Sequence, residues 1–134
     1  MPRMTDKDYA TLLGFRTELR RFLHWSEEQA RASGLTPAQH QLMLAVKGHP
    51  DPAGPTIGDV AEYLALRHHS AVELADRAEQ AGLVERRRDD EDHRVMRLRL
   101  TADGEERIQR LSRLHLDELR QLAPLLAGLD DPRG

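Results

Sequence analysis

Cysteine is absent from this chain of 134 residues, and aromatic residues make up only 4% of it. Without cysteine there can be no disulfide framework, no thiolate nucleophile or redox sensor, and no zinc site built on sulfur. No uninterrupted apolar run approaches the roughly 20 residues that span a bilayer, and the N-terminus lacks the apolar stretch of a secretory signal. We therefore expect a protein of the cytoplasm that has no membrane partner.

An excess of basic charge is also missing, because the formal net charge is -3 at pH 7. Proteins that bind nucleic acid through bulk charge are usually strongly basic, so any DNA contact must come from a local cluster of cations. The sequence contains no glycine-rich phosphate loop, no H-E-x-x-H motif and no Ser-His-acid set tied together by a motif. A small hydrolase or metalloenzyme is therefore disfavoured, and we expect no catalytic residue, no metal and no cofactor.

What the sequence does contain is helical periodicity, which together with capping signals predicts five helices in one domain over residues 1–134. The fourth helix follows Arg67, and Gly34 and Gly82 are the predicted stops after the first and fourth helices. Pro124 is expected to kink or end the fifth helix. The other four helices open on a threonine N-cap, at Thr5, Thr36, Thr56 and Thr101.

The middle of the chain predicts a DNA-binding motif. The third and fourth helices are short and joined by a tight connection, which is typical of a helix-turn-helix. Beyond them, residues 95–100 alternate between apolar side chains on one face and Arg97 and Arg99 on the other, as in a half-buried strand. A polar loop separates this run from residues 83–88, so we expect a β-hairpin.

The long terminal helices, in residues 1–34 and 105–134, carry apolar stripes that need a partner. A helix-turn-helix domain over residues 35–104 is not expected to require them to close its core. Symmetric dimers are the commonest oligomers, and pairs of helices bury such stripes well. We therefore expect a homodimer in which the terminal segments are dimerisation helices.

Candidate DNA contacts lie on the fourth helix and on the hairpin. A recognition helix presents its N-terminal residues to the major groove, and an arginine at a hairpin tip can enter the narrow minor groove. The acidic residues between 85 and 92 nearly balance the hairpin arginines, so a DNA contact requires these acids to pair inward with arginine or to lie off the DNA face. The competing interpretation is a solvated surface. The candidates are Arg67, His68, His69, Ser70, Val72, Glu73, Arg77, Arg86, Arg94, Arg97 and Arg99.

Three segments resemble the MarR (multiple antibiotic resistance regulator) family. Residues 92–104 read DHRVMRLRLTADG and match the family's D-x-R-x-x-x-L-x-L-T-x-x-G pattern. Directly before the hairpin, residues 76–84 read DRAEQAGLV and are similar to its D-R-L-E-x-x-G-L-V, with Ala78 in place of a common leucine. Residues 35–39, LTPAQ, are also similar.

This resemblance implies a mainly α (α+β) fold, a winged helix-turn-helix with a β-hairpin wing and long dimerisation helices. It also implies a transcriptional regulator, expected to be a repressor, whose dimer reads a pseudo-palindromic DNA operator. Arg94 matches the wing-tip arginine of the family, and Asp92 matches the acid that orients the wing. Arg67, His68 and His69 stand where many members carry small hydroxyl and amide residues.

Aromatic and histidine side chains suggest two further sites. Phe22, His24, Trp25 and His40 could line a pocket between the first, second and fifth helices, where relatives of the resembled family accept small aromatic acids; the ligand expected here is a small aromatic acid or phenol. Packing is the alternative role of these side chains. A zinc site would have to be assembled across helices from residues such as His24, His40 and His115, but His115 lies on an apolar stripe and is expected to be a hydrogen-bonded core or interface histidine.

A rival function is a winged-helix module that binds another protein without binding DNA. In that case the acidic loop of the hairpin would repel DNA. Outward-facing arginines near a hairpin tip favour DNA, since a protein-binding wing has no need for them. The sequence therefore predicts a ligand-responsive DNA-binding dimer.

Overall fold

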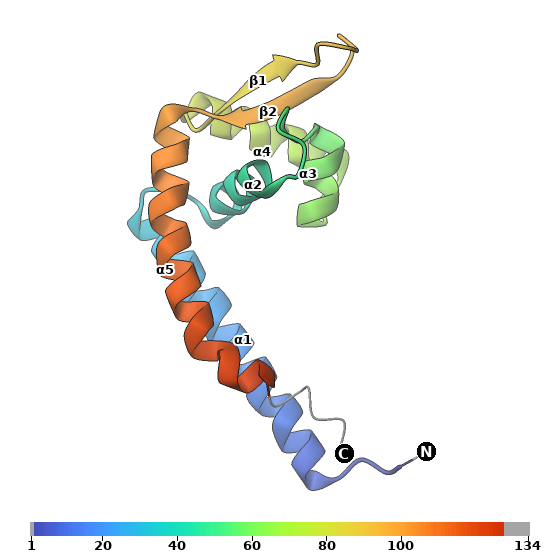
Figure 1. The fold of residues 1–134 in the computed structure, drawn as a ribbon, viewed down its shortest axis with the longest axis vertical. Coiled ribbons are helices and arrows are strands. Elements are labelled where there is room, and N and C mark those ends of the chain that lie inside the picture. The colour runs from blue at the N-terminus through green and yellow to red at the C-terminus, as the bar shows by residue number, and fades with distance from the viewer. Residues whose placement is uncertain (1, 128–134) are drawn as a thin grey trace.

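The structure is a computed structural model, and it describes residues 2–127. The five predicted helices and the predicted hairpin are all present in the expected order. None of the described helices is long and apolar enough to cross a membrane. Figure 1 shows, along the chain, α1 (Asp6–Ala32), α2 (Pro37–Gly48), α3 (Ile57–Leu64), α4 (His68–Gln80), β1 (Val84–Arg88), β2 (Met96–Leu100) and α5 (Ala102–Ala127).

The threonine N-caps fix where the helices begin. Thr5, Thr36 and Thr56 each accept a hydrogen bond from the backbone N–H of the third residue of their helix. In all three cases the side chain of that third residue accepts from the backbone N–H of the threonine, which completes a capping box. Thr101 caps α5 by accepting a hydrogen bond from the Gly104 N–H at 3.0 Å. This cap is not a capping box, because Gly104 has no side chain to return a hydrogen bond.

The wing is a two-stranded antiparallel sheet to which the loop after α2 adds a short third segment. β1 and β2 pair from Val84 opposite Leu100 to Arg88 opposite Met96. An isolated bridge joins Thr56 to Arg97, and the Leu98 N–H donates to the carbonyl of Pro55 at 2.9 Å. The start of α3 is therefore hydrogen-bonded to the wing.

The hydrophobic core extends beyond the predicted limits of residues 35–104. Ala30 near the end of α1 is fully buried, and Ile108 and Leu111 in the first turns of α5 are each 1% exposed. All three belong to one cluster with Leu42 and Leu98. The terminal helices thus complete the core, because the faces of α1 and α5 nearest the core cover apolar side chains that the central helices and the wing leave open.

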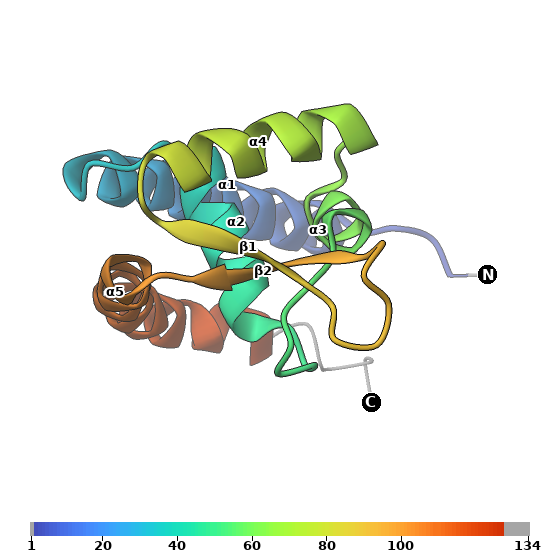
Figure 2. The same ribbon diagram turned by 90° about the horizontal axis from the view of Figure 1, so that it is seen from above.

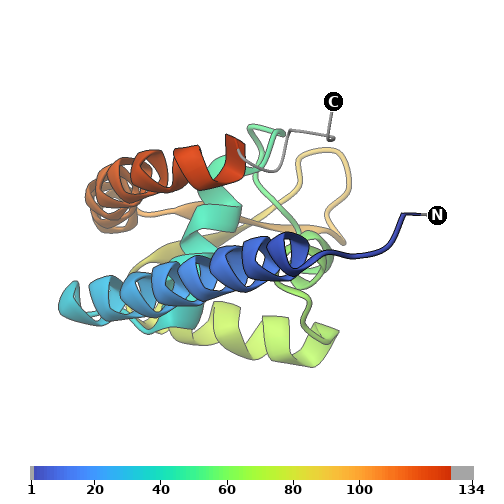
Figure 3. The ribbon, with the colours of Figure 1, turned by 90° about the horizontal axis from the view of Figure 1, so that it is seen from below.

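Beyond the core, α1 and α5 run side by side and project from it (Figures 1 and 3). Pro124 was expected to kink or end α5; it does not end the helix, which continues through this residue to Ala127. A proline this close to a helix terminus removes only one backbone hydrogen bond, which the preceding turns outweigh. Residues 128–134, the end of the predicted dimerisation segment, lie outside the described residues.

Candidate nucleic-acid interface

The turn between α3 and α4 sets the direction of α4. Ala65 adopts a left-handed conformation (φ 54°), and the Leu66 N–H closes the end of α3 on the carbonyl of Ala61 at 2.9 Å. Only residues 65–67 separate the two helices. The buried face of α4, which consists of Ala71, Leu74, Ala75 and Ala78, packs on the core and turns the opposite face outward.

The outward face of α4 carries the predicted recognition residues. Arg67, His68, His69, Glu73 and Arg77 are exposed. Seen from above, α4 lies beside the hairpin, at the end of the molecule away from the N-terminus of α1 (Figures 1 and 2). The two remaining candidates on this helix are half-buried, at Ser70 and Val72. The fold thus places all seven predicted residues on α4 and its N-cap, and the C-terminal part of this helix contacts β1 through Asp76 and Glu79.

The N-terminus of α4 differs from those of the other four described helices. Its N-cap position is Arg67, whose side chain makes no capping hydrogen bond. The first backbone N–H groups of a helix have no partner within it. With the partial positive charge of the helix dipole, such groups can bind a phosphate.

Arg86 on β1 is held by α4. Its two terminal nitrogens donate to Asp76 Oδ1 at 2.6 Å and to Glu79 Oε1 at 3.0 Å. The Arg86 side chain is only 22% exposed. Arg86 was predicted to bind DNA, a role that remains a prediction. In the described structure its guanidinium fixes α4 against the wing.

At the tip of the wing, Arg94 is exposed, with 90% of its side chain accessible. Its Nε and Nη2 donate to Asp92 Oδ1 and Oδ2 at 3.0 and 3.1 Å. These hydrogen bonds hold the pKa of the Asp92 carboxyl below its usual range. Asp92 therefore stays ionised and holds the Arg94 side chain, while its role in orienting the wing remains a prediction.

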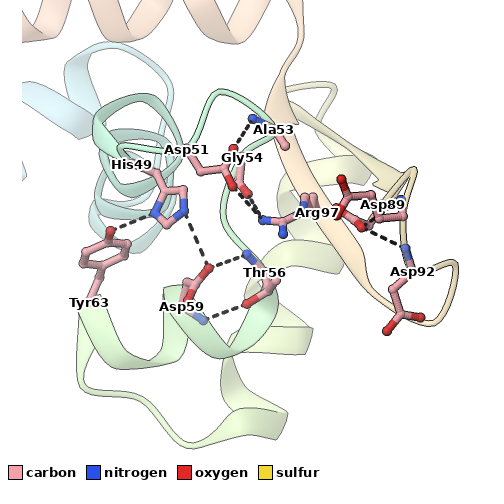
Figure 4. A network of polar contacts seen from close by, with 11 residues as sticks. His49, Asp51, Ala53, Gly54, Thr56, Asp59, Tyr63, Asp89, Asp92 and Arg97 are labelled. Carbon is pink, nitrogen blue, oxygen red and sulfur yellow. Dashed lines mark hydrogen bonds and ion pairs between the residues drawn. The ribbon is translucent and has the colours of Figure 1, made fainter.

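Arg97 and Arg99 share a strand face but have different surroundings. The Arg97 side chain is 21% exposed, and its Nε donates to Asp89 Oδ1 at 2.7 Å while Nη1 donates to the Gly54 carbonyl at 2.8 Å (Figure 4). The Arg97 hydrogen bond lowers the pKa of Asp89. Arg99 is half-buried, and its side chain makes no hydrogen bond or ion pair with the described residues. The alternation of apolar residues and arginines correctly predicted which face of β2 carries Arg97 and Arg99. It could not reveal that Arg97 is hydrogen-bonded to the loop after α2.

Sequence reasoning missed a second polar group beside Arg97. His49, just after α2, bonds through Nδ1 to the Tyr63 hydroxyl at 2.8 Å, and its Nε2 lies 3.7 Å from Asp59 Oδ2 (Figure 4). Asp59 also accepts from the Thr56 N–H, which is the main cause of its lowered pKa. The C-terminus of α2 is thereby attached to α3. The capping pattern identified Asp59, whereas nothing in the sequence indicated its contact with His49.

The predicted ligand pocket is divided in the structure. Trp25, Phe22 and His40 surround His115 with ring-centre distances of 4.9, 5.9 and 4.8 Å. The Nε2 of His24 instead lies 3.0 Å from Glu28 Oε1, and the His24 side chain is 73% exposed. His24 and Trp25 both line a shallow hollow of about 450 Å³ on α1, which is separate from the hollow beside His40.

His40 borders a small hollow of about 230 Å³ between α1 and α2, which is also lined by Ser26 and Gln41. The His40 side chain is buried, and its Nδ1 has no hydrogen-bond partner among residues 2–127. Burial and then repulsion by His115 lower the pKa of His40 to about 4. His115 donates from Nδ1 to the carbonyl of Leu111 and lies 2.7 Å from Ser26 Oγ, which confirms its predicted hydrogen bonding. Among residues 2–127 no three His, Asp or Glu side chains are grouped as a metal site.

Comparison with known proteins identifies related sequences. A family model described as the MarR family matches residues 33–95, from just before α2 to just before β2. The HTH-type transcriptional repressor MdtR of Bacillus subtilis (strain 168) is 31% identical over 78 residues, which are 58% of this chain and 48% of that protein. The chain thus spans about half the length of this curated relative.

Solved structures share the fold across most of the chain. A MarR family transcription regulator, SP03579, is 26% identical with a TM-score of 0.71, covering 92% of this chain and 78% of that one. AbsC, a MarR family transcriptional regulator from Streptomyces coelicolor, is 19% identical with a TM-score of 0.71 over 99% and 87% of the two chains. A point mutant of S. aureus MepR, bound to an oligodeoxyribonucleotide, is 21% identical with a TM-score of 0.68 over 90% and 83%. These similarities confirm the predicted winged helix-turn-helix.

Proposed function

Because the chain belongs to the MarR family, as the match over residues 33–95 and the shared fold show, we propose that it is a transcriptional regulator that binds double-stranded DNA. The observation that carries this proposal is the exposed face of α4 beside a wing whose tip presents an exposed arginine. The MepR mutant of similar fold is bound to an oligodeoxyribonucleotide, which supports the same conclusion.

In the proposed complex, α4 enters the major groove with its uncapped N-terminus toward a phosphate. Arg67, His68 and His69 lie at that end of the helix and are placed to meet the backbone and base edges. Arg94 reaches the adjacent minor groove. Two of the five acids of the wing favour this arrangement, since Asp89 and Asp92 pair with arginines instead of standing unpaired at the surface.

Binding to DNA should be strongly dependent on salt. Each arginine contact with a phosphate releases condensed counterions, so a protein that makes about 6 to 10 such contacts loses roughly 10³- to 10⁵-fold in affinity between about 50 and 200 mM salt. The measurement is a gel-shift or anisotropy titration against the promoter region of the chain's own gene. A slope near zero in the log-log plot would contradict the proposal and favour the protein-interaction module.

We further propose that the regulator is a homodimer that reads a pseudo-palindromic operator and acts as a repressor. Large apolar side chains on α1 and α5 are 41% to 68% exposed, and burying them against a second copy is favourable. Sedimentation at micromolar concentration should give about twice the chain mass of 15.3 kDa. A monomer mass would exclude this use of the helices. The exposed set includes Leu12, Leu13, Leu19, Leu23, Leu114, Leu116 and Leu119.

A small aromatic acid or phenol remains the proposed effector. The hollow beside His40 offers a buried polar atom, and Trp25 and Phe22 offer aromatic surface around the neighbouring ring of His115; both features support this class of ligand. His24 lines a separate hollow on α1 together with Trp25. Such a molecule would act as an effector only if it bound the DNA-competent and incompetent states with different affinities.

A further inference from the structure

The wing tip is connected to the loop after α2 by a continuous series of hydrogen bonds. The loop after α2 contributes the Gly54 carbonyl, which accepts from Arg97 Nη1 at 2.8 Å. Arg97 Nε donates to Asp89 Oδ1 at 2.7 Å. The other carboxylate oxygen of Asp89 accepts from the backbone N–H groups of Glu91 and Asp92 at 3.1 and 2.9 Å. Figure 4 shows Arg97 between the two loops.

Asp92 then orients the exposed arginine of the tip. Besides pairing with the Arg94 guanidinium, Asp92 Oδ1 accepts from the Arg94 backbone N–H at 3.1 Å. Side-chain hydrogen bonds of this kind fix the backbone of a tight loop. The position of Arg94 therefore depends on Asp89, and the position of Asp89 depends on Arg97.

We propose that Arg97 is a positioning residue, which anchors the wing-tip loop to the loop after α2 and thereby aims Arg94 at DNA without contacting DNA itself. This inference rests on the proposed function and goes beyond it, since Arg97 was expected to be a DNA contact. Only arginine can satisfy this position: its planar fork donates to a carboxylate and a carbonyl in different directions at once. A lysine has one ammonium group and can reach one of the two.

The free protein provides the first test. In Arg97→Met, the Asp89 carboxylate loses its anchor, so the amides of Glu91 and Asp92 should lose protection in hydrogen-exchange NMR, while amides in α2 keep theirs. Unchanged exchange at Glu91 and Asp92 would overturn the inference without reference to DNA. If Arg97→Met fails to fold, Asp89→Asn replaces it in this experiment, because it keeps the size of the side chain and removes its charge. The same loss of amide protection at Glu91 and Asp92 is then expected.

The second test is a double-mutant cycle on the labelled promoter duplex. Arg94→Ala should weaken binding about 5- to 150-fold, and Arg97→Met should weaken it within that range. In the Arg94→Ala background, Arg97→Met should change affinity by a factor of about two or less, because its effect passes through Arg94. Arg97→Lys should restore part of the affinity.

Arg99→Met is the matched control, since Arg99 lies on the same strand face as Arg97 but has no bond to Asp89. Its effect, whatever its size, should multiply with that of Arg94→Ala. The positioning role would be overturned if the losses of DNA affinity caused by Arg97→Met and Arg94→Ala multiplied in the double variant. It would also be overturned if Arg97→Met bound DNA with full affinity. A wild-type chain that binds no duplex would instead overturn the proposed function, so the two failures are distinguishable.

Discussion

Replacing Gly104 by alanine should destabilise the fold by about 3 kcal/mol or more, since overpacking against backbone exceeds the usual cost of an extra methyl group. A Cβ at Gly104 would lie 2.2 Å from the carbonyl oxygen of Leu83 and 3.2 Å from its carbon. That carbonyl also accepts the Thr101 N–H, so it cannot withdraw without breaking the junction of the wing and α5. Chemical denaturation followed by circular dichroism measures the loss.

Gly58→Ala is the matched control for this substitution. Gly58 also lies in the first turn of a helix, but a Cβ there would meet its nearest neighbour, Thr56 Oγ1, at 3.7 Å, which is ordinary contact. Alanine is the better helix former, so Gly58→Ala should raise the free energy of unfolding by up to about 1 kcal/mol. Equal effects at Gly58 and Gly104 would show that the close approach to Leu83 is unimportant.

Acidification should remove about 3 kcal/mol of stability through His40 alone, since one pKa unit corresponds to about 1.36 kcal/mol. The pKa of His40 falls from 6.5 in the unfolded chain to about 4 in the folded protein. Between these values the unfolded state binds a proton that the folded state does not, so stability rises with pH. His40 therefore has its full stabilising effect above pH 6.5, and this effect is lost as the pH falls toward 4.

His40→Leu provides the control for the acid effect. The variant removes the titrating group together with the unpartnered Nδ1, and leucine has a similar volume. Denaturation midpoints of both proteins should be measured from pH 7 to pH 4, because carboxylates titrate in both and cancel in the difference. Parallel pH profiles would mean that His40 is protonated as readily in the folded state as in the unfolded one.

The helices and the hairpin were predictable because their signals are local. Thr36 followed by Pro37 and Gln39 contains a complete helix start within four residues, and the alternation around Leu98 shows the period of a strand directly. The exposed face of α4 was predicted from the helical spacing of its apolar residues.

The internal roles of two arginines could not be predicted, because their partners are set by tertiary contact. Arg97 binds the carbonyl of Gly54, which is 43 residues earlier in the chain. A backbone acceptor has no sequence signature at all. Arg86 is bound to two acids of the preceding helix, and the sequence shows these acids only as members of a polar face. Charge counting recognised the balance of acids and arginines but could not say which pairs form.

Thr101 alone separates β2 from α5. Because this junction is so short, we expect the wing and the long helix to move together as one rigid unit. Thr101 Oγ1 donates to the Gly82 carbonyl at 2.6 Å, so the joint is also clamped to the end of α4. With 26 residues, α5 is about 39 Å long at about 1.5 Å per residue. A tilt of about 5° at the junction therefore moves the far end of α5 by about 3 Å. Contacts made far from the DNA can thus set the tilt of the wing through leverage, without any rearrangement inside the helix-turn-helix.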